Sequence, residues 1–268
     1  MKNAANLIIT LEISLLIQAV FFLFAASLKT DKVTDLSYGL SFVILAFFLL
    51  LKNGPAGPAQ VVLAMMVFLW GIRLVTYLLY RIVRIKRDAR FDGIREHFWK
   101  FFQFWLFQGI AVWIIMLPVT VWFQTPAPWG LLMYAGSGIW LAGLAVETVA
   151  DLQKFRQKSG ASGVHRWMSS GLWRYSRHPN YFGELLCWWG VFLFVASDLK
   201  GWGWLSVLGP VTITYLLLYV TGIPTLEQSA EKKWGSNPEY NSYKRATNAL
   251  IPWPPRSSRE SDLVFKGR

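Results

Sequence analysis

The sequence has little of what forms a disulfide or holds a metal. Its only cysteine, Cys187, cannot pair within the chain. No internal disulfide framework is therefore possible, and thiols do not indicate a cellular compartment. The three histidines, His97, His165 and His178, lie in separate segments without the spacing of metal ligands. This scarcity argues against a zinc site, and we expect no metal in the functional site.

Charged residues are also scarce for a soluble domain. They make up 16% of the 268 residues, against 54% hydrophobic and 16% aromatic residues, a balance that is typical of a membrane protein. Acidic residues are outnumbered, 15 to 27, by Lys and Arg, so the net charge is +12. The basic residues lie between hydrophobic runs and not on one soluble face, which argues against nucleic acid as a partner. We consider two reasons for the excess of basic residues: cytoplasmic loops collect Lys and Arg, and an anionic cofactor needs basic partners.

Seven hydrophobic runs are each close to the ~20 residues that a membrane-spanning helix requires. They cover about residues 5–27, 34–51, 58–81, 100–123, 128–150, 180–198 and 202–222. The sequence therefore predicts an all-α, polytopic bundle in contact with membrane lipids. We expect one domain over about residues 1–255, divided into substrate-side helices (1–123) and a cofactor-binding half (124–255), followed by a flexible tail (256–268).

Lys and Arg are concentrated in the odd-numbered connections between these runs. The third connection carries Arg81, Arg84, Lys86, Arg87, Arg90 and Arg95, and the fifth carries Lys154, Arg156, Lys158, Arg166, Arg174 and Arg177. The even-numbered connections are short and nearly neutral. Because cytoplasmic loops collect basic residues, the N-terminus is predicted outside and the C-terminus in the cytoplasm.

Polar side chains inside the predicted spans are candidates for function, since an ionisable group there costs roughly 2.5–3.5 kcal/mol. Asp35 and Tyr38 lie three residues apart at the start of the second run, on one helical face. Tyr77 continues a polar stripe that begins at Arg73 in the third run. The alternative for Asp35 is a carboxylate that complements the dipole at a helix N-terminus.

A second group of candidates lies at the end of the fifth run. Glu147 and Asp151 are four residues apart on one helical face, and Lys154, Arg156 and Lys158 follow. Two carboxylates beside a basic run suggest a site in which the carboxylates accept hydrogen bonds from ligand hydroxyls and the basic residues bind phosphate. A solvated helix end would show the same pattern.

The densest polar signal runs from Trp173 to Glu184. Pro179 suits the first turn of a helix, so that Asn180 and Glu184 lie one turn apart inside a hydrophobic run. The residues around this helix start are Arg174, Tyr175, Arg177, His178 and Tyr181. This density of donors, aromatic rings and one buried acid indicates a binding site.

Three stretches together resemble the steroid 5α-reductase family, and in particular its bacterial branch with the steroid reductase C-terminal domain. They are the run from Gly171 to Gly190, the run from Ala150 to Arg156, and the segment from Gly222 through Trp234 and Tyr240 to Pro252. The wider superfamily includes sterol C14 reductases and isoprenylcysteine carboxyl methyltransferase, which shares the Arg-His-Pro-x-Tyr-x-Gly core. In a bacterium, such a protein would lie in the inner membrane with its cofactor on the cytoplasmic side.

The resemblance implies an NADPH-dependent enzyme that reduces a carbon–carbon double bond of a lipid-like enone. The cofactor-binding positions that it implies, together with the basic run, are Asp151, Lys154, Arg156, Lys158, Arg174, Tyr175, Arg177, His178, Asn180, Tyr181, Glu184, Glu227, Tyr240 and Tyr243. The Gln-Glu pair with which animal steroid reductases hold the ketone is missing. We therefore expect Asp35, in its neutral acid form and assisted by Tyr38 or Tyr77, to act as the catalytic hydrogen-bond donor.

Two alternatives remain open. One is a membrane methyltransferase that uses S-adenosylmethionine, and the other is a lipid-binding membrane protein without enzymatic activity. Asn180 and Glu184 match the reductase pattern, and a sulfonium cofactor has no 2′-phosphate that would need Lys154, Arg156 and Lys158. These residues favour the reductase.

Overall fold

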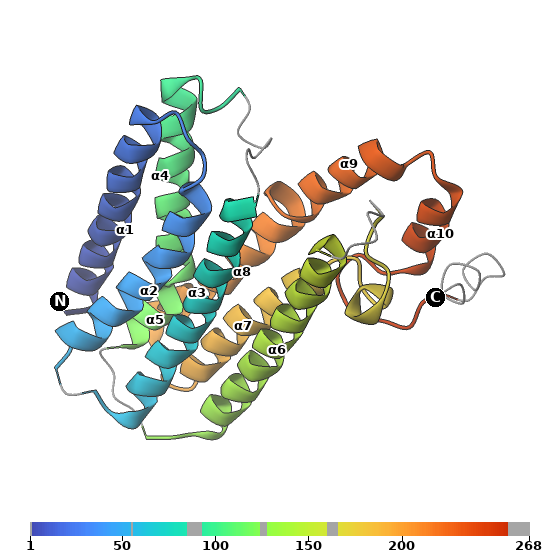
Figure 1. The fold of residues 1–268 in the computed structure, drawn as a ribbon. Helices are drawn as coiled ribbons and strands as arrows, with labels where there is room; N and C mark the ends of the chain where they lie inside the picture. The colour runs from blue at the N-terminus through green and yellow to red at the C-terminus, as the bar shows by residue number, and fades with distance from the viewer. Residues whose placement is uncertain (1, 55, 85–92, 124–127, 160–165, 257–268) are drawn as a thin grey trace. The chain divides into compact units, whose positions relative to one another are not determined.

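The computed structural model describes residues 2–54, 56–84, 93–123, 128–159 and 166–256 (Figure 1). Within these residues the chain is helical and forms no β-sheet. The α-helices are α1 (Lys2–Ser27), α2 (Thr34–Lys52), α3 (Pro58–Arg84), α4 (Phe98–Ile115), α5 (Leu117–Trp122), α6 (Leu131–Ser159), α7 (Pro179–Ala196), α8 (Leu208–Tyr215), α9 (Ile223–Trp234) and α10 (Pro238–Ala246). The 3-10 helices η2 (Gly171–Arg174) and η3 (Gly201–Val207) and the π-helix η4 (Leu216–Val220) complete the described elements. The all-α prediction is confirmed for this part of the chain.

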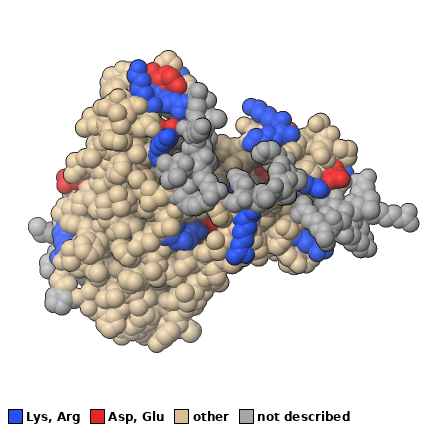
Figure 2. All heavy atoms as spheres, in the orientation of Figure 1, with Lys and Arg blue, Asp and Glu red and all other residues tan. Residues whose placement is uncertain are grey.

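Six helical stretches among the described residues are long and apolar enough to cross a membrane. They are Ala4–Ser27, Thr34–Lys52, Pro58–Leu79, Phe98–Ile115, Leu131–Gln157 and Gly201–Trp234. Charged side chains occupy few places on the face shown in Figure 2, and uncharged side chains cover most of the rest. The chain is therefore a multi-pass integral membrane protein.

The run predicted as a span at 180–198 forms helix α7 but is not among these six stretches. Asn180 and Glu184 in its first two turns lower its mean hydropathy. Cys187, Trp188 and Phe194 are buried within the protein, so α7 is largely covered by other helices. The seven spans and the orientation therefore stay predictions. Three of the basic residues on which the orientation depends lie outside the described residues: Lys86, Arg87 and Arg90.

Two predicted spans differ in detail from the helices observed. The run at 100–123 is divided into α4 and α5 next to Pro118, whose ring nitrogen cannot donate the helical hydrogen bond. The last span begins as η3, continues as α8 and widens into the π-helix η4. Thr221 N donates to Leu216 O over 2.8 Å at its end. Gly222 follows, and a Cβ there would lie 2.4 Å from Leu217 O, so only glycine fits the turn into α9.

The chain forms two compact units. The first contains residues 1–137 and 190–212, and the second contains residues 138–189 and 213–268. In the first unit α1 packs on α2 and α4, and α2 packs on α3. Phe22, Phe101 and Trp105 form an aromatic cluster between α1 and α4. Residues 190–212 thus belong to the same unit as residues 1–137, although they are far apart in the sequence.

Polar side chains join α1, α2 and α4 inside the first unit. Gln108 Nε2 donates to Gln18 Oε1 over 2.8 Å and to Ser37 Oγ over 3.0 Å. Gln18 Nε2 in turn donates to Ser41 Oγ over 2.9 Å. Because lipid offers no competing hydrogen bonds, such a satisfied network links neighbouring membrane helices.

In the second unit α6 and α7 run side by side and pack backbone to backbone (Figure 1). A Cβ at Gly183 would lie 2.6 Å from both Gly143 O and Glu147 N, so a side chain at this position would clash. Small residues at a membrane helix interface permit this close approach. The packing places the end of α6 beside the start of α7, where the predicted cofactor residues lie.

Candidate functional site

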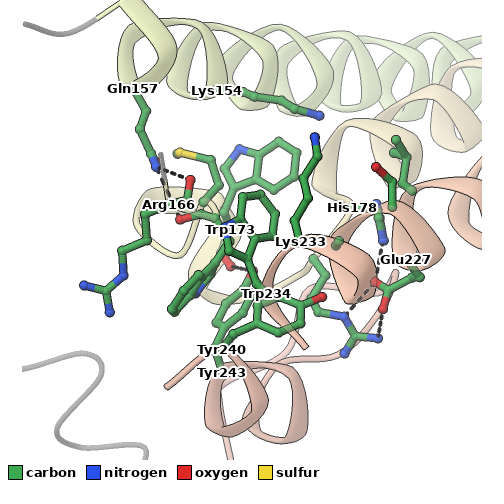
Figure 3. Close-up of a pocket in the computed structure, with 16 residues that line it drawn as sticks. Lys154, Gln157, Arg166, Trp173, His178, Glu227, Lys233, Trp234, Tyr240 and Tyr243 are labelled. Carbon is green, nitrogen blue, oxygen red and sulfur yellow. Dashed lines mark hydrogen bonds and ion pairs between the residues drawn. The ribbon is translucent and has the colours of Figure 1, made fainter. Parts of the chain in front are cut away.

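A cavity of about 240 Å³ lies in the second unit, among α6, the segment 166–178, α9 and α10 (Figure 3). Its lining combines aromatic rings with basic side chains. The lining residues are Lys154, Gln157, Arg166, Trp167, Met168, Trp173, Arg177, His178, Leu226, Glu227, Ser229, Ala230, Lys233, Trp234, Tyr240 and Tyr243.

The short helix η2 is fixed on α6 and carries one wall of the cavity. Gly171 adopts a positive φ of 61°, and a Cβ there would lie 2.4 Å from the side-chain nitrogen of Gln153. The Gln153 Oε1 atom accepts from Leu172 N over 3.0 Å. The Trp173 indole donates to Ala150 O over 3.1 Å. These bonds hold the Trp173 ring at the cavity.

Three other rings form an aromatic wall. The Trp167 centroid lies 5.3 Å from that of Tyr240 and 6.2 Å from that of Trp234, with the rings edge to face. Tyr243, on the next turn of α10, donates its hydroxyl to Trp173 O over 2.7 Å. Burial raises the pKa of the Tyr240 hydroxyl, so this ring is neutral at physiological pH. The wall therefore offers flat apolar faces to a ligand ring.

Basic side chains lie over this wall. In Figure 3, Lys154 of α6 and Lys233 of α9 extend toward the same part of the cavity. The Lys154 ammonium lies 5.0 Å from the centre of the Trp173 ring. Arg166 stacks 4.6 Å from the centre of the Trp167 ring and pairs with Glu239.

Glu227 is the only acidic residue among the described residues that line the cavity. Its Oε1 atom accepts from His178 Nε2 over 2.8 Å and from Arg177 Nε over 3.0 Å. Arg177 also donates from Nη1 to Lys244 O over 2.9 Å and to Thr247 O over 2.6 Å, at the end of α10. Arg177 therefore joins the start of α7 to α9 and α10.

His178 is buried and its ring is parallel to that of Tyr181, with 5.8 Å between the ring centres. Burial lowers the pKa of His178, although Glu227 opposes the shift. His178 is therefore neutral at neutral pH, with Nε2–H donating to Glu227. The buried Nδ1 atom has no hydrogen-bond partner among the described residues, which leaves an acceptor for a ligand or a water molecule.

The cavity brings together six of the predicted cofactor-binding residues. They are Lys154, Arg177, His178, Glu227, Tyr240 and Tyr243. The other predicted residues do not line it: Asp151 and Glu184 are buried, Asn180 and Tyr181 are half-buried, and Arg156, Arg174 and Tyr175 are exposed. The side chain of Lys158 lies outside the described residues.

The sequence reasoning missed Trp167, Lys233 and Trp234. A signal for two of them was present in the sequence of α9. Leu226, Ala230 and Lys233 recur at the helical spacing of four and three residues, and Trp234 follows Lys233. Trp167 belongs to no such pattern, since it reaches the cavity only because residues 166–170 pack against α10.

The predicted catalytic residues lie in the first unit. Asp35 and Tyr38 are half-buried in the first two turns of α2, and Tyr77 is half-buried in α3. A Cβ at Gly39 would lie 2.8 Å from the Val75 side chain, which sets α2 against α3. This register places all three residues at the same end of the helix pair.

The charge of the cavity favours an anionic ligand. The described residues that line it include four Lys or Arg residues and one Glu, and Glu227 is already bonded to Arg177 and His178. Within the described part of the chain no group of three or more His, Cys, Asp or Glu residues is arranged to hold a metal ion. Aromatic faces and two converging lysines fit a ligand that has both a flat ring and phosphate groups.

Comparison with known proteins gives one family. The model of the family described as "Protein of unknown function (DUF1295)" matches residues 21–247, which is most of the chain. No curated protein and no solved structure matches the chain. The matched range includes the two converging lysines, Glu227 and the aromatic wall. The chain therefore belongs to the DUF1295 family.

Proposed function

We propose that this protein is a membrane-embedded, NADPH-dependent reductase of a carbon–carbon double bond in a lipid-like enone. The observation that carries the proposal is a single cavity in which Lys154 and Lys233 converge beside aromatic walls. NADPH joins an adenine ring to a 2′-phosphate and a pyrophosphate. These are the two chemical features that such a cavity can bind at once.

The size of the cavity supports one end of the cofactor as its occupant. Pockets for ligands of drug size occupy roughly 300–1,000 Å³, whereas this cavity has about 240 Å³. This size suits a part of the cofactor better than a whole dinucleotide. We therefore assign the adenine ring to the wall formed by Trp167, Trp234 and Tyr240, and a phosphate group to Lys154 and Lys233.

The same electrostatics argue against S-adenosylmethionine. That cofactor carries a positive sulfonium and has no phosphate. A cavity lined by four basic residues and one acidic residue repels such a cation. The methyltransferase alternative therefore has less support than the reductase, although an adenine ring alone would suit the aromatic wall of either enzyme.

When bound, NADPH supplies a hydride to the double bond of the substrate. The chain itself must hold the cofactor, exclude water and stabilise the enolate oxygen that develops. We assign the last role to Asp35, helped by Tyr38 or Tyr77. A carboxyl or phenol hydroxyl at this position can donate a hydrogen bond to such an oxygen.

The cofactor assignment is tested by titrating purified protein in lipid nanodiscs with NADPH, NADH and S-adenosylmethionine. Trp167, Trp173 and Trp234 line the cavity, so energy transfer from tryptophan to bound dihydronicotinamide reports binding. Lys154→Ala and Lys233→Ala should each weaken NADPH binding by about tenfold or more, as expected for a lost charged hydrogen bond. Lys232→Ala is the matched control, because Lys232 is exposed on the same helix and does not line the cavity.

The results separate three readings. If Lys232→Ala weakens NADPH binding as much as Lys233→Ala, the cavity is not the cofactor site. If the lysine variants lose NADH and NADPH equally, these side chains hold the pyrophosphate and not the 2′-phosphate. Saturable binding of S-adenosylmethionine without binding of NADPH would replace the reductase with the methyltransferase.

The catalytic assignment has its own test. Asp35→Asn should lower turnover of an enone strongly while NADPH affinity is retained, because an amide is a far weaker acid than a carboxyl group. The measurement is NADPH oxidation with a panel of steroid, fatty and prenyl enones. Unchanged turnover would remove Asp35 from the site.

A further inference from the structure

The segment 248–256, which we call the C-terminal strap, is bonded to residues 175–177, just before α7. Asn248 O accepts from Arg177 N over 2.8 Å, and Leu250 O accepts from Ser176 Oγ over 2.7 Å. Trp253 N donates to Tyr175 O over 3.0 Å. The strap is thus held by backbone hydrogen bonds at several points.

Although its backbone is held, the strap leaves large apolar side chains uncovered. Ile251 is 59% exposed and Trp253 is 65% exposed. Tyr175, to which Trp253 is bonded, is 41% exposed. A water-facing loop of a soluble protein does not gather such side chains, and an exposed apolar patch usually indicates an interaction surface.

The depth of the strap relates this patch to the membrane. The Trp173 indole is bonded to Ala150 O, and Ala150 belongs to the membrane span Leu131–Gln157. At 1.5 Å per residue, Ala150 lies about 10 Å before the end of that span. Tyr175 follows Trp173 by two residues and carries Trp253. The polar residues Asp151 and Lys154 follow Ala150 in α6. Tyr175 and Trp253 are therefore tied to the polar end of this span, which is the part of a membrane helix expected near lipid headgroups.

The charge around the patch is positive. Arg174, Arg245 and Arg256 are exposed. Two hydrogen bonds bring the backbone of this region together: Thr247 Oγ1 donates to Arg174 O over 3.3 Å, and Arg256 N donates to Ala246 O over 3.0 Å. No Asp or Glu occurs in residues 171–183 or 240–256. This composition complements anionic lipid headgroups.

We propose that the C-terminal strap is an interfacial anchor that binds anionic lipid. Trp253 and Ile251 enter the boundary between headgroups and acyl chains, where an indole can bury its ring and keep its N–H hydrated. Arg174, Arg245 and Arg256 bind the lipid phosphates above them. This surface is separate from the cavity, and the proposal does not depend on the cofactor or on the reaction.

The test places an environment-sensitive fluorophore on the strap of the full chain. Trp253→Cys is labelled with a nitrobenzoxadiazole thiol reagent and reconstituted into vesicles. The native Cys187 is buried, and its background labelling is measured in wild type treated with the same reagent. Ser236→Cys is the matched control, since Ser236 is exposed in the polar turn between α9 and α10. Both positions are exposed, so neither substitution removes a core side chain.

The fluorophore at residue 253 should emit at shorter wavelength than the one at residue 236. A nitroxide on an anionic lipid headgroup should quench it more than about twofold better than a nitroxide on a zwitterionic headgroup, because basic residues enrich anionic lipid nearby. Replacing Arg174 and Arg256 together with Gln should abolish this preference. Equal emission at residues 253 and 236, or equal quenching by the two lipids, would overturn the proposal.

The alternative is that a second copy of the chain, and not lipid, contacts the exposed side chains of the strap. Nanodiscs that contain one chain each separate the two cases. If the short-wavelength emission at residue 253 persists in such discs, lipid covers the strap. If it is lost there and returns at two chains per disc, the surface is an interface between copies and the lipid anchor is wrong.

Discussion

Glu227 determines what its two basic neighbours can do. Arg177 uses its guanidinium to bind this carboxylate and two carbonyls at the end of α10, so few of its donors remain for a ligand. His178 donates to the same carboxylate and keeps Nδ1 directed elsewhere. The two adjacent residues, equivalent in a sequence pattern, therefore differ in role: Arg177 holds elements together, whereas His178 retains an acceptor.

Arg177→Ala should destabilise the fold. It removes the ion pair with Glu227 and the bonds to Lys244 O and Thr247 O. For a partly buried pair we expect a loss on the order of 1–3 kcal/mol, between the values for exposed and buried pairs. The measurement is thermal unfolding in detergent without cofactor. Arg156→Ala, which removes an exposed arginine of α6, is the control and should leave the melting temperature unchanged; equal losses in both variants would contradict the role of Arg177.

His178 should make the folded state sensitive to mild acid. Burial lowers the pKa of His178 below its ordinary value of 6.5, so below about pH 6.5 the unfolded chain binds the proton before the folded chain does. Stability therefore falls as the pH decreases from about 6.5 toward the folded pKa, and above this range the residue adds no pH dependence. His178→Gln can still donate to Glu227 but does not titrate. Melting temperatures between pH 7.5 and 5 should fall less steeply for this variant, and parallel curves would show that other groups cause the acid sensitivity.

Helices α6 and α7 approach each other closely in the second unit because glycines lie at their interface. Gly143 and Gly183 let the two backbones meet, and a Cβ at Gly143 would lie 2.6 Å from Gly183 O. Such packing fixes the end of α6 relative to the start of α7. The sequence shows the two glycines but not their pairing, because pairing depends on which faces of two distant helices come together.

Gly183→Ala should weaken this interface strongly. The added methyl would lie 2.6 Å from both Gly143 O and Glu147 N, and backbone atoms cannot move aside as flexible side chains can. Gly138→Ala on α6 is the matched control, since nothing lies within 4 Å of its Cβ. We expect Gly138→Ala to be neutral or to stabilise by roughly 0.5–1 kcal/mol, because alanine is the better helix former. Similar yields of folded protein for the two variants, measured by size-exclusion chromatography and thermal unfolding, would show that the interface tolerates expansion.

Some residues of the candidate site can be predicted from helical periodicity, whereas others are placed only by packing between distant segments. The stripe of Leu226, Ala230 and Lys233 on α9 could be read from helical spacing. The polar run at the start of α7 was also evident. Trp167 could not be found in this way, because its place beside Tyr240 results from a loop that folds back on α10. The cavity therefore contains residues that local patterns predict and residues that only long-range packing supplies.

The number of spans decides how the whole molecule lies in the membrane. Among the described residues, six stretches meet the length and hydropathy of a span, and α7 would be the seventh. Seven crossings put the two termini on opposite sides, whereas six put them on the same side. Because α7 is mostly covered by protein and needs little lipid contact, its lower hydropathy is compatible with a crossing.

We predict seven crossings with the C-terminus in the cytoplasm. In a bacterial host, a C-terminal green fluorescent protein fusion should fluoresce and a C-terminal alkaline phosphatase fusion should be inactive. A cysteine placed at the N-terminus should react with a membrane-impermeant maleimide in intact cells. Both termini on the same side would reduce the crossings to an even number and remove α7 from the spans.

The sequence by itself determined the membrane character, the helical class, the approximate position of most spans and several basic and aromatic residues of the site. These follow from hydropathy and spacing within short windows, which depend on neighbours along the chain. Only the tertiary structure decided that Lys233 and three tryptophans join those residues around a cavity, that Arg177 is a structural link and that the C-terminal strap leaves Trp253 exposed. These depend on which faces of distant helices meet, and a long apolar helix can present several faces to a neighbour at nearly equal cost.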